Sequence, residues 1–220
     1  MSTKLYWASV SPLCDQARFD RLAASVWPAR QEKLQKLRFD GARRLSLGVA
    51  LLLQKALLDA GLWSDALVEG THGKLFFADL PDFHFSFSHS GERVLCAVSD
   101  ADIGCDLERL HSFDLHVAER FFHPTEAAYL VSLPEEQRTE AFFRLWTGKE
   151  SFMKATGLGF ALPMKDFAIV PDGDRATVAQ SYDDRDYCLR YVALDDYICA
   201  LCTVGAYNDF TLIPVDFIRK

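Results

Sequence analysis

Two long helical patterns, each followed by short strand-like segments, restrict the fold of this chain more than any other feature. Over residues 40–60 apolar side chains recur at helical spacing, and Gly61 stands at the expected end. A second long helix is expected over 134–155, with proline in its first turn and Gly157 after its end. Because strand patterns follow each helix, the chain is predicted to adopt an α+β fold.

The remaining elements are expected to be short. Helices are predicted at 15–25, 29–37, 114–121 and 124–132, and strands at 4–10, 66–69, 74–77, 84–88, 93–99 and 102–107. Residues 166–204 are predicted to form further strands, with a hairpin turn at Asp172-Gly173. Two of the strands, RVLCAVS at 93–99 and YICALCT at 197–203, are similar in sequence. This similarity indicates two like α+β lobes, expected at 1–110 and 111–220, with a cleft between them.

Composition argues against several classes of protein. The 220 residues carry 24 basic and 31 acidic side chains, a net charge of −7, which argues against binding nucleic acid or a membrane through a broad basic surface. The longest apolar run, 47–53, is far shorter than the roughly 20 residues of a membrane span. The first residues lack the pattern of a secretory signal, so a cytoplasmic location is expected. Of the six cysteines, only Cys199 and Cys202 have CxxC spacing, and on a strand they face opposite sides.

A pair of carboxylates is the first candidate for a catalytic or metal-binding site. Asp106 and Glu108 are two residues apart in IGCDLER (103–109), a predicted strand, so both side chains leave the same face. Neighbouring carboxylates repel each other unless a cation lies between them or one of them is protonated. Two such groups suit Mg²⁺, which prefers oxygen ligands. The alternative is a solvated strand edge with an accidental DxE pattern.

A third carboxylate lies in RLWTGKESFMKA (144–155). On a helix, Glu150 and Lys154 are four residues apart and share a face, so the simple alternative is a surface ion pair worth roughly 0.2–0.5 kcal/mol. Trp146, one turn earlier, would partly bury that face. A buried Glu150 needs a partner, and a cation held by Asp106 and Glu108 would supply one.

Three further segments carry candidate phosphate ligands. In FSFSHSGE (85–92), Ser88 and His89 are hydrogen-bond donors at the end of a strand, although a histidine there is more often structural. In THGKLFF (71–77), Gly73 would let a ligand approach the backbone next to Lys74. The third segment, 30–44, carries a local basic excess, which indicates either an anion site or a solvated helix face. Its basic residues are Arg30, Lys33, Lys36, Arg38, Arg43 and Arg44.

The order and spacing of these segments resemble the 4′-phosphopantetheinyl transferases, specifically the larger type named after the surfactin synthetase activator, Sfp. The resemblance spans nearly the whole chain. Its most specific part is GCDLE followed about forty residues later by WTGKESFMK, with FFHPTEAAYL (121–130) similar to the FF-x-x-x-E segment that lies between these motifs in the family. The resemblance implies the family fold, in which two similar α+β lobes are related by a pseudo-twofold axis and the active site lies in the cleft between them.

The resemblance also implies an activity, the transfer of 4′-phosphopantetheine from coenzyme A to a serine of an apo acyl or peptidyl carrier protein. Asp106, Glu108 and Glu150 would bind Mg²⁺, or Mn²⁺ in its place. The catalytic residues would be Asp106, Glu150 and Lys154: Glu150, or a water that it holds, would take the serine proton, and Lys154 would assist the leaving 3′,5′-ADP. The coenzyme A contacts would be Arg30, Lys33, Arg43, Arg44, Gly73, Lys74, Ser88, His89 and Lys154.

Two alternatives stay open from the sequence: a narrower holo-acyl-carrier-protein synthase that serves only fatty-acid synthesis, and a non-catalytic module that binds coenzyme A and carrier proteins. The length of 220 residues favours a two-lobe monomer over the short one-lobe synthases that form trimers. The carrier protein is expected to dock along 110–130, where apolar side chains exceed what one helix face needs. The sequence departs from the family pattern at Leu45, Leu75, Ser86 and Gly148.

Overall fold

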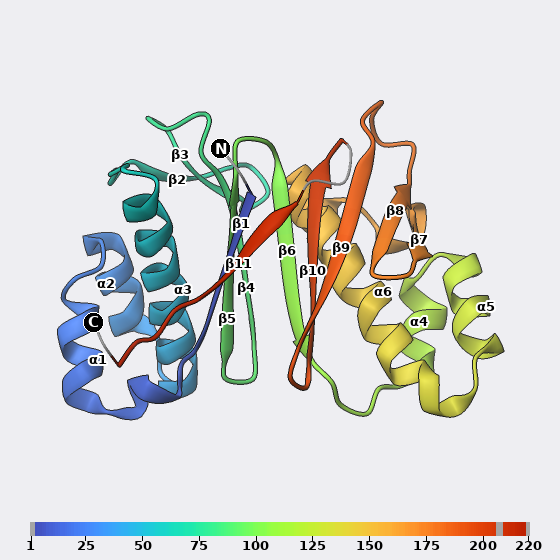
Figure 1. Cartoon of the computed structure of the whole chain (residues 1–220), viewed down its shortest axis with the longest axis horizontal. Helices are drawn as coiled ribbons and strands as arrows, with labels where there is room; N and C mark the ends of the chain where they lie inside the picture. The colour runs from blue at the N-terminus through green and yellow to red at the C-terminus, as the bar shows by residue number, and fades with distance from the viewer. Residues whose placement is uncertain (1–2, 206–208, 219–220) are drawn as a thin grey trace.

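Strands lie in the middle of the molecule and helices lie on both outer sides (Figure 1). The structure is a computed structural model and describes residues 3–205 and 209–218. The strands are β1 (Thr3–Ser9), β2 (Leu67–Glu69), β3 (Leu75–Phe77), β4 (His84–Ser90), β5 (Arg93–Ser99), β6 (Ile103–Arg109), β7 (Ala168–Asp172), β8 (Arg175–Ala179), β9 (Tyr187–Leu194), β10 (Tyr197–Val204) and β11 (Phe210–Pro214). The helices are α1 (Gln16–Ala23), α2 (Pro28–Lys36), α3 (Asp40–Asp59), α4 (Leu115–Phe121), α5 (Pro124–Ser132) and α6 (Glu135–Thr156), with short 3₁₀ turns at Ser11–Cys14, Gly159–Ala161 and Met164–Asp166.

Two sheets and three apolar clusters make up the body of the fold. The first sheet has the strand order β11-β1-β5-β4 and the second has the order β6-β10-β9-β8-β7, while β2 and β3 form a separate hairpin. One cluster joins α3 to the first sheet, and another joins α4, α5 and α6 to the second. A third cluster lies between the sheets and includes Leu5 and Leu95 from the first and Cys105 and Leu201 from the second. The layers therefore run helix, sheet, sheet, helix.

The two halves of the chain repeat one topology, which confirms the expectation of two similar α+β lobes. In the first half, β1 pairs antiparallel with β5, and β5 pairs antiparallel with β4. In the second half, β6 pairs antiparallel with β10, and β10 pairs antiparallel with β9. A long helix lies between the first strand and the later pair in each half, α3 in one and α6 in the other. The two similar segments of sequence, β5 and β10, occupy equivalent places.

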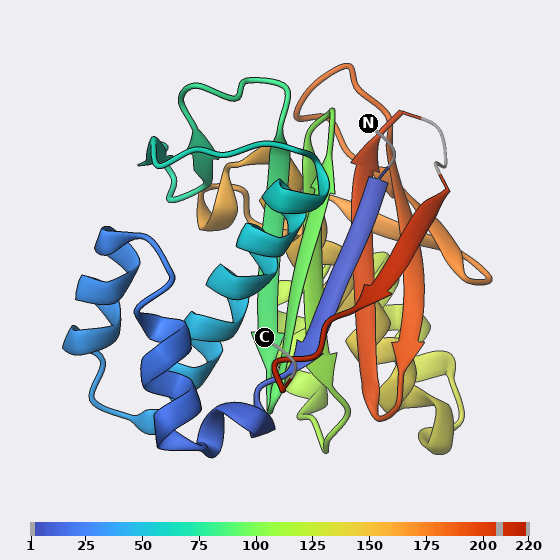
Figure 2. The same cartoon turned by 60° about the vertical axis from the view of Figure 1, so that its left-hand side comes forward.

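Sheet membership changes between β5 and β6, ahead of residue 110. The last described strand, β11, returns to the first sheet, where it pairs parallel with β1 (Figure 2). β6 therefore lies in the same sheet as the strands after residue 110, and β11 lies in the same sheet as the strands before it. A division of the chain into two lobes at residue 110 stays a prediction. None of the described helices combines the length and the apolar composition that a membrane span requires.

Gly104 in β6 lets α6 lie directly against the strand. A Cβ atom built at this position would overlap the carbonyl oxygen of Ser151 and would lie 2.5 Å from the backbone nitrogen of Ala155. Both neighbours are backbone atoms of the helix, so a side chain on Gly104 cannot be accommodated by a change of rotamer. The glycine thus fixes how close the residues of α6 come to those of β6.

Gly104→Ala is expected to lower stability by about 1–3 kcal/mol or more, the usual result of overpacking a close contact. The measurement is the melting temperature, which falls by roughly 2–4 °C per kcal/mol in a chain of this size. Gly41→Ala is the matched control, because nothing lies within 4 Å of a Cβ built there. Equal melting temperatures for the two variants would show that the helix yields at no cost.

Candidate active site

Asp106 and Glu108 project from one face of β6, as the sequence predicts, while their neighbours Cys105 and Leu107 face the cluster between the sheets. The Asp106 side chain is buried, with 5% of its surface exposed. Its Oδ1 accepts hydrogen bonds from Ser88 Oγ and from Lys154 Nζ, both at 2.7 Å. Its Oδ2 is buried and has no hydrogen-bond partner among the described residues. Asp106 therefore keeps one carboxylate oxygen available for a ligand.

Lys154 forms its ion pair with Asp106 across the junction of α6 and β6, rather than with Glu150 one turn away. Its Nζ also donates to the backbone carbonyl of Cys105 at 3.2 Å. Burial alone would lower the pKa of Lys154, but the charge of Asp106 and their hydrogen bond raise it above its ordinary value. The lysine is thus a permanent positive charge within this group of acidic side chains.

Burial disfavours the charged form of the other two carboxylates. Burial raises the pKa of Glu108, and the nearby Asp106 charge adds to the rise, while a hydrogen bond from Ser90 opposes it. Burial also raises the pKa of Glu150, with further contributions from Asp106 and Glu108. No described residue donates a hydrogen bond to the Glu150 carboxylate. Lys154 therefore balances only part of the negative charge.

A divalent cation fits this donor set in its chemistry. Hard cations such as Mg²⁺ take oxygen ligands, and the unpartnered Oδ2 of Asp106 and the mutual repulsion of the three carboxylates are both relieved by positive charge. Within the described ranges, no three acidic, histidine or cysteine side chains already lie close enough together to form a metal site. A metal bound by Asp106, Glu108 and Glu150 stays a prediction.

A cavity of about 360 Å³ opens beside Lys154. Its lining includes residues of the segment 69–75, Gly73 among them, and Met153 and Lys154 near the end of α6. Of the predicted ligand-binding residues, the cavity brings together Lys33, Gly73, Lys74 and Lys154. The other lining residues are Glu69, His72, Leu75, Phe85, Ser86, Phe87, Met153, Gly157 and Gly159.

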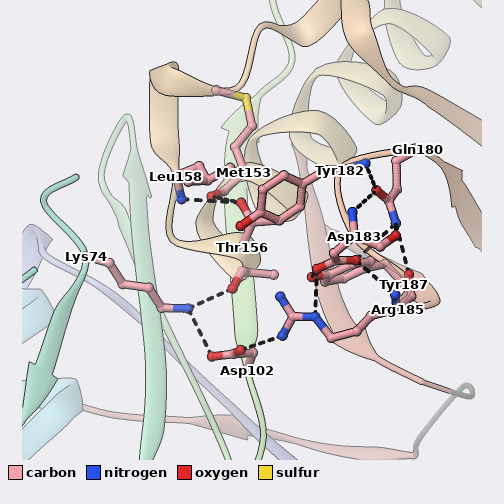
Figure 3. A network of polar contacts seen from close by, with 11 residues as sticks. Lys74, Asp102, Met153, Thr156, Leu158, Gln180, Tyr182, Asp183, Arg185 and Tyr187 are labelled. Atoms are coloured by element: carbon pink, nitrogen blue, oxygen red, sulfur yellow. Dashed lines mark hydrogen bonds and ion pairs between the residues drawn. The ribbon is translucent and has the colours of Figure 1, made fainter. Parts of the chain in front are cut away.

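The Lys74 ammonium group ties one wall of the cavity to the second lobe (Figure 3). Its Nζ donates to the backbone carbonyl of Ala155 at 2.9 Å and lies 3.8 Å from Asp102 Oδ1. Asp102 in turn accepts a hydrogen bond from Arg185 Nη1 at 2.9 Å. Burial lowers the pKa of Lys74, and the Asp102 charge opposes that effect. The side chain of Lys74 therefore anchors the loop that carries Gly73.

The basic segment is divided by the structure. Among its described residues, Lys33 lines the cavity, whereas Arg30 is buried and donates to Ser46 Oγ at 3.2 Å. Burial lowers the pKa of Arg30. Arg43 and Arg44 line a separate small hollow of about 50 Å³. The geometry therefore brings Lys33 to the cavity and does not bring the other three predicted phosphate ligands there.

The two predicted phosphate ligands on β4 have different surroundings. Ser88 is buried and donates its hydroxyl to Asp106. His89 alternates to the other face of β4 and is exposed, but burial lowers its pKa and the charges of Lys154 and Lys33 lower it further, so its imidazole lies near the charges of the site. Ser86 and Ser90, which lie on the same face as Ser88, also bond to β6. The sequence placed Ser90 on the same strand as Ser88 but gave it no role, because that role depends on a strand that is paired in another sheet.

A buried ion pair behind the site is a second feature that the sequence did not reveal. Lys149 has no exposed side-chain surface, and its Nζ lies 2.7 Å from Glu126 Oε2, itself 3% exposed. Lys149 also donates to the carbonyls of Met164 and Phe167 at 2.7 and 2.8 Å. Glu126 Oε1 accepts from the backbone nitrogen of Ile169 at 2.7 Å. The pair fixes α5, α6 and the start of β7 to one another, and so supports the helix that carries Glu150 and Lys154.

Sequence comparison finds relatives that are similar to this chain over most of its length. A family model described as the 4′-phosphopantetheinyl transferase superfamily matches residues 102–202. A 4′-phosphopantetheinyl transferase of Bacillus subtilis is 32% identical over 221 residues, which are 94% of this chain and 99% of that protein. The 4′-phosphopantetheinyl transferase Sfp of Bacillus subtilis (strain 168) is 31% identical over 94% of each chain. Among solved structures, an ACPS–CoA complex from Chronobacterium ammoniagenes matches with a TM-score of 0.38 and 20% identity, over 49% of this chain and 98% of that one.

Proposed function

The chain belongs to the 4′-phosphopantetheinyl transferase superfamily, and from this membership we infer that it is an enzyme that transfers 4′-phosphopantetheine from coenzyme A to a serine of an apo carrier protein. The products are the holo-carrier protein and 3′,5′-ADP. The observation that carries this function is the ion pair of Lys154 with Asp106 next to the 360 Å³ cavity that Lys154 lines, with Glu150 near enough for its pKa to respond to both charges. The chain is also similar to known transferases over nearly its whole length.

We propose that the cavity holds coenzyme A, with the pyrophosphate at its Lys154 end. Lys154 would pair with the pyrophosphate oxygens and stabilise the charge that builds up on the leaving 3′,5′-ADP. Asp106, Glu108 and Glu150 would hold Mg²⁺, or Mn²⁺, by carboxylate oxygens. When bound, such a cation supplies positive charge to the phosphate oxygens at the reacting phosphorus.

The carrier serine loses a proton during transfer, so the reaction needs a base. The carrier serine forms a new oxygen–phosphorus bond as the bond from phosphorus to the leaving ADP breaks, and the serine proton must leave at the same time. Glu150 has no hydrogen-bond donor among the described residues, and burial raises its pKa toward that of a useful base. We propose that the Glu150 carboxylate, or a water molecule that it holds, accepts this proton.

One assay tests the proposed function and its alternatives. The purified protein is incubated with coenzyme A, Mg²⁺ and a panel of apo acyl and peptidyl carrier proteins, and the carriers are measured by intact mass. Modification of several carrier types supports the broad transferase. Modification of the fatty-acid carrier alone indicates the narrow synthase, and binding without any mass increase indicates a non-catalytic module. The same proposal includes a monomer located in the cytoplasm, which sizing by light scattering and cell fractionation would test.

Lys33→Ala is expected to raise the KM for coenzyme A about tenfold, since a charge-assisted hydrogen bond to phosphate is worth roughly 1.5–3 kcal/mol. The KM for dephospho-coenzyme A, which lacks the 3′-phosphate, should change less. The comparison variant is Arg43→Ala/Arg44→Ala, whose side chains line a different hollow. A large rise in the KM for coenzyme A in that double variant, with no rise in Lys33→Ala, would show that Arg43 and Arg44 bind the phosphate and Lys33 does not.

The carrier protein is proposed to dock along 110–130. Leu115 and Val117 are half-buried against the core of the second lobe, whereas Phe121 is 45% exposed and Phe122 is buried. Polar replacements of Leu115, Val117 and Phe121, made singly, are expected to raise the KM for the carrier about fivefold, because a residue at the centre of an interface costs about 1 kcal/mol or more. Unchanged coenzyme A affinity and melting temperature are the controls. Activity lost in step with stability would place these residues in the core alone.

A further inference from the structure

A row of serines joins the two sheets at the candidate active site. β4 is the last strand of the first sheet and β6 is the first strand of the second, so no backbone ladder connects them. Ser86, Ser88 and Ser90 alternate along β4 and all face β6. Ser86 Oγ accepts a hydrogen bond from the backbone nitrogen of Cys105 at 3.0 Å. The contacts that a backbone ladder would make are here made by side chains.

Ser90 has its hydroxyl proton directed at Glu108. The backbone nitrogen of Arg109 donates to Ser90 Oγ at 3.1 Å, which occupies an acceptor position of that oxygen. Ser90 Oγ itself lies 2.7 Å from Glu108 Oε2 and donates to it. Because one side of the hydroxyl is fixed by the backbone, its proton is oriented toward the carboxylate. The rotation of the Glu108 carboxylate is restricted as a result.

Ser88 donates a hydrogen bond to the other carboxylate of the pair, that of Asp106. It is buried, and its Oγ donates to Asp106 Oδ1 at 2.7 Å. Lys154 Nζ binds the same oxygen from the other element at 2.7 Å. Two donors on Oδ1 leave Oδ2 as the oxygen without a partner. Ser88 and Lys154 therefore share the orientation of the Asp106 carboxylate.

We propose that Ser88 and Ser90 are positioning residues that hold the carboxylates of Asp106 and Glu108 in the orientation needed to bind a divalent cation. The proposal rests on the proposed function for its kinetic consequences and on the hydrogen bonds alone for its effect on cation binding. It gives Ser88 a role toward Asp106 instead of the coenzyme A contact that the resemblance implies, and it gives Ser90 a role that no sequence motif assigned.

The test centres on Ser90→Ala, with Mn²⁺ as the probe because its free form is measured by electron paramagnetic resonance. Residues that orient metal ligands typically contribute 10–100-fold to metal affinity. Ser90→Ala and Ser88→Ala are each expected to weaken Mn²⁺ binding at least about tenfold and to lower kcat at fixed Mn²⁺, with the KM for coenzyme A changed less than about twofold. Ser90→Thr keeps the hydroxyl and suits a strand, so it should restore both values.

Two further variants complete the experiment. Asp106→Ala sets the level of Mn²⁺ binding without the site. Ser99→Ala removes another buried strand hydroxyl, one that bonds to Thr3 away from the site, and should leave Mn²⁺ affinity and kcat as in the wild type.

The outcomes separate this proposal from the proposed function. Wild-type Mn²⁺ affinity in Ser90→Ala and Ser88→Ala overturns the positioning role. A raised KM for coenzyme A at unchanged Mn²⁺ affinity also overturns it, because the serines then act on the substrate. Absence of Asp106-dependent Mn²⁺ binding in the wild-type protein overturns it as well. If the serine variants bind Mn²⁺ more weakly but the wild-type protein modifies no carrier protein, the positioning role is supported and the proposed function is wrong.

Discussion

Asp106→Ala is expected to reduce phosphopantetheine transfer by at least about a hundred- to a thousandfold, the usual effect of removing one group that stabilises a charged transition state. Asp106 joins three parts of the site, since its Oδ1 binds Ser88 and Lys154 and its Oδ2 is left for a ligand. Without the carboxylate, Lys154 loses its ion-pair partner and the proposed cation loses a ligand. The measurement is the initial rate of carrier modification by intact mass, together with circular dichroism of the variant.

Two controls make this result specific. Asp106→Asn keeps the size of the side chain and an acceptor for Ser88, so it should fold as the wild type does and still lose transfer. Asp174→Ala removes an exposed carboxylate that pairs with Arg190 in the second sheet, and its rate should be that of the wild type. Full transfer by Asp106→Asn, or wild-type turnover in excess chelator, would rule out a metal site at these carboxylates.

Lys149→Met is expected to cost about 3–5 kcal/mol of stability, because it leaves the Glu126 charge buried without a partner. It also removes the donor to two carbonyls, those of Met164 and Phe167. In a chain of this size the melting temperature should fall by roughly 6–20 °C, at 2–4 °C per kcal/mol. Urea unfolding followed by circular dichroism measures the free energy directly.

Matched variants separate burial from the loss of a charge pair. Lys55→Met breaks the partly exposed pair with Asp59 on α3 and should cost less than about 1 kcal/mol. Lys149→Met/Glu126→Gln removes both buried charges and should recover part of the stability that Lys149→Met loses. Equal losses for Lys149→Met and Lys55→Met would mean that water reaches the buried pair.

The parts of this protein that follow from local patterns were predictable from its sequence. Helical spacing located α3 and α6 within a few residues, and the Asp172-Gly173 signal located the turn between β7 and β8. The two-residue period of a strand placed Asp106 and Glu108 on one face. It also separated Cys199 and Cys202, which lie in different apolar clusters. In each case the information lies within one turn of helix or a few residues of strand.

The parts that depend on contacts between distant segments were not predictable. Lys154 pairs with Asp106 and not with Glu150, because α6 lies against β6 at Gly104. Gly148 stood out in the sequence only as a departure from the family pattern, whereas in the structure a Cβ there would lie 2.5 Å from the Tyr191 hydroxyl. The orientation of Arg43 also depends on a contact between distant segments, because its guanidinium group packs over the ring of Phe19 in another helix.

The parallel pair of β1 and β11 sets an order for folding. Thr3 lies opposite Phe210, so this contact closes a loop of about 200 residues, roughly twice the loop closed when β1 pairs with β5, and the longer loop costs only about 0.6 kcal/mol more. β11 is also an edge strand of exposed and half-buried residues, whereas β5 is buried along almost its whole length, so β11 gains less from pairing. β1 and β5 should therefore pair first, and β11 should dock last. Backbone amides of β1 that face β11 should then exchange with solvent deuterium sooner than those that face β5.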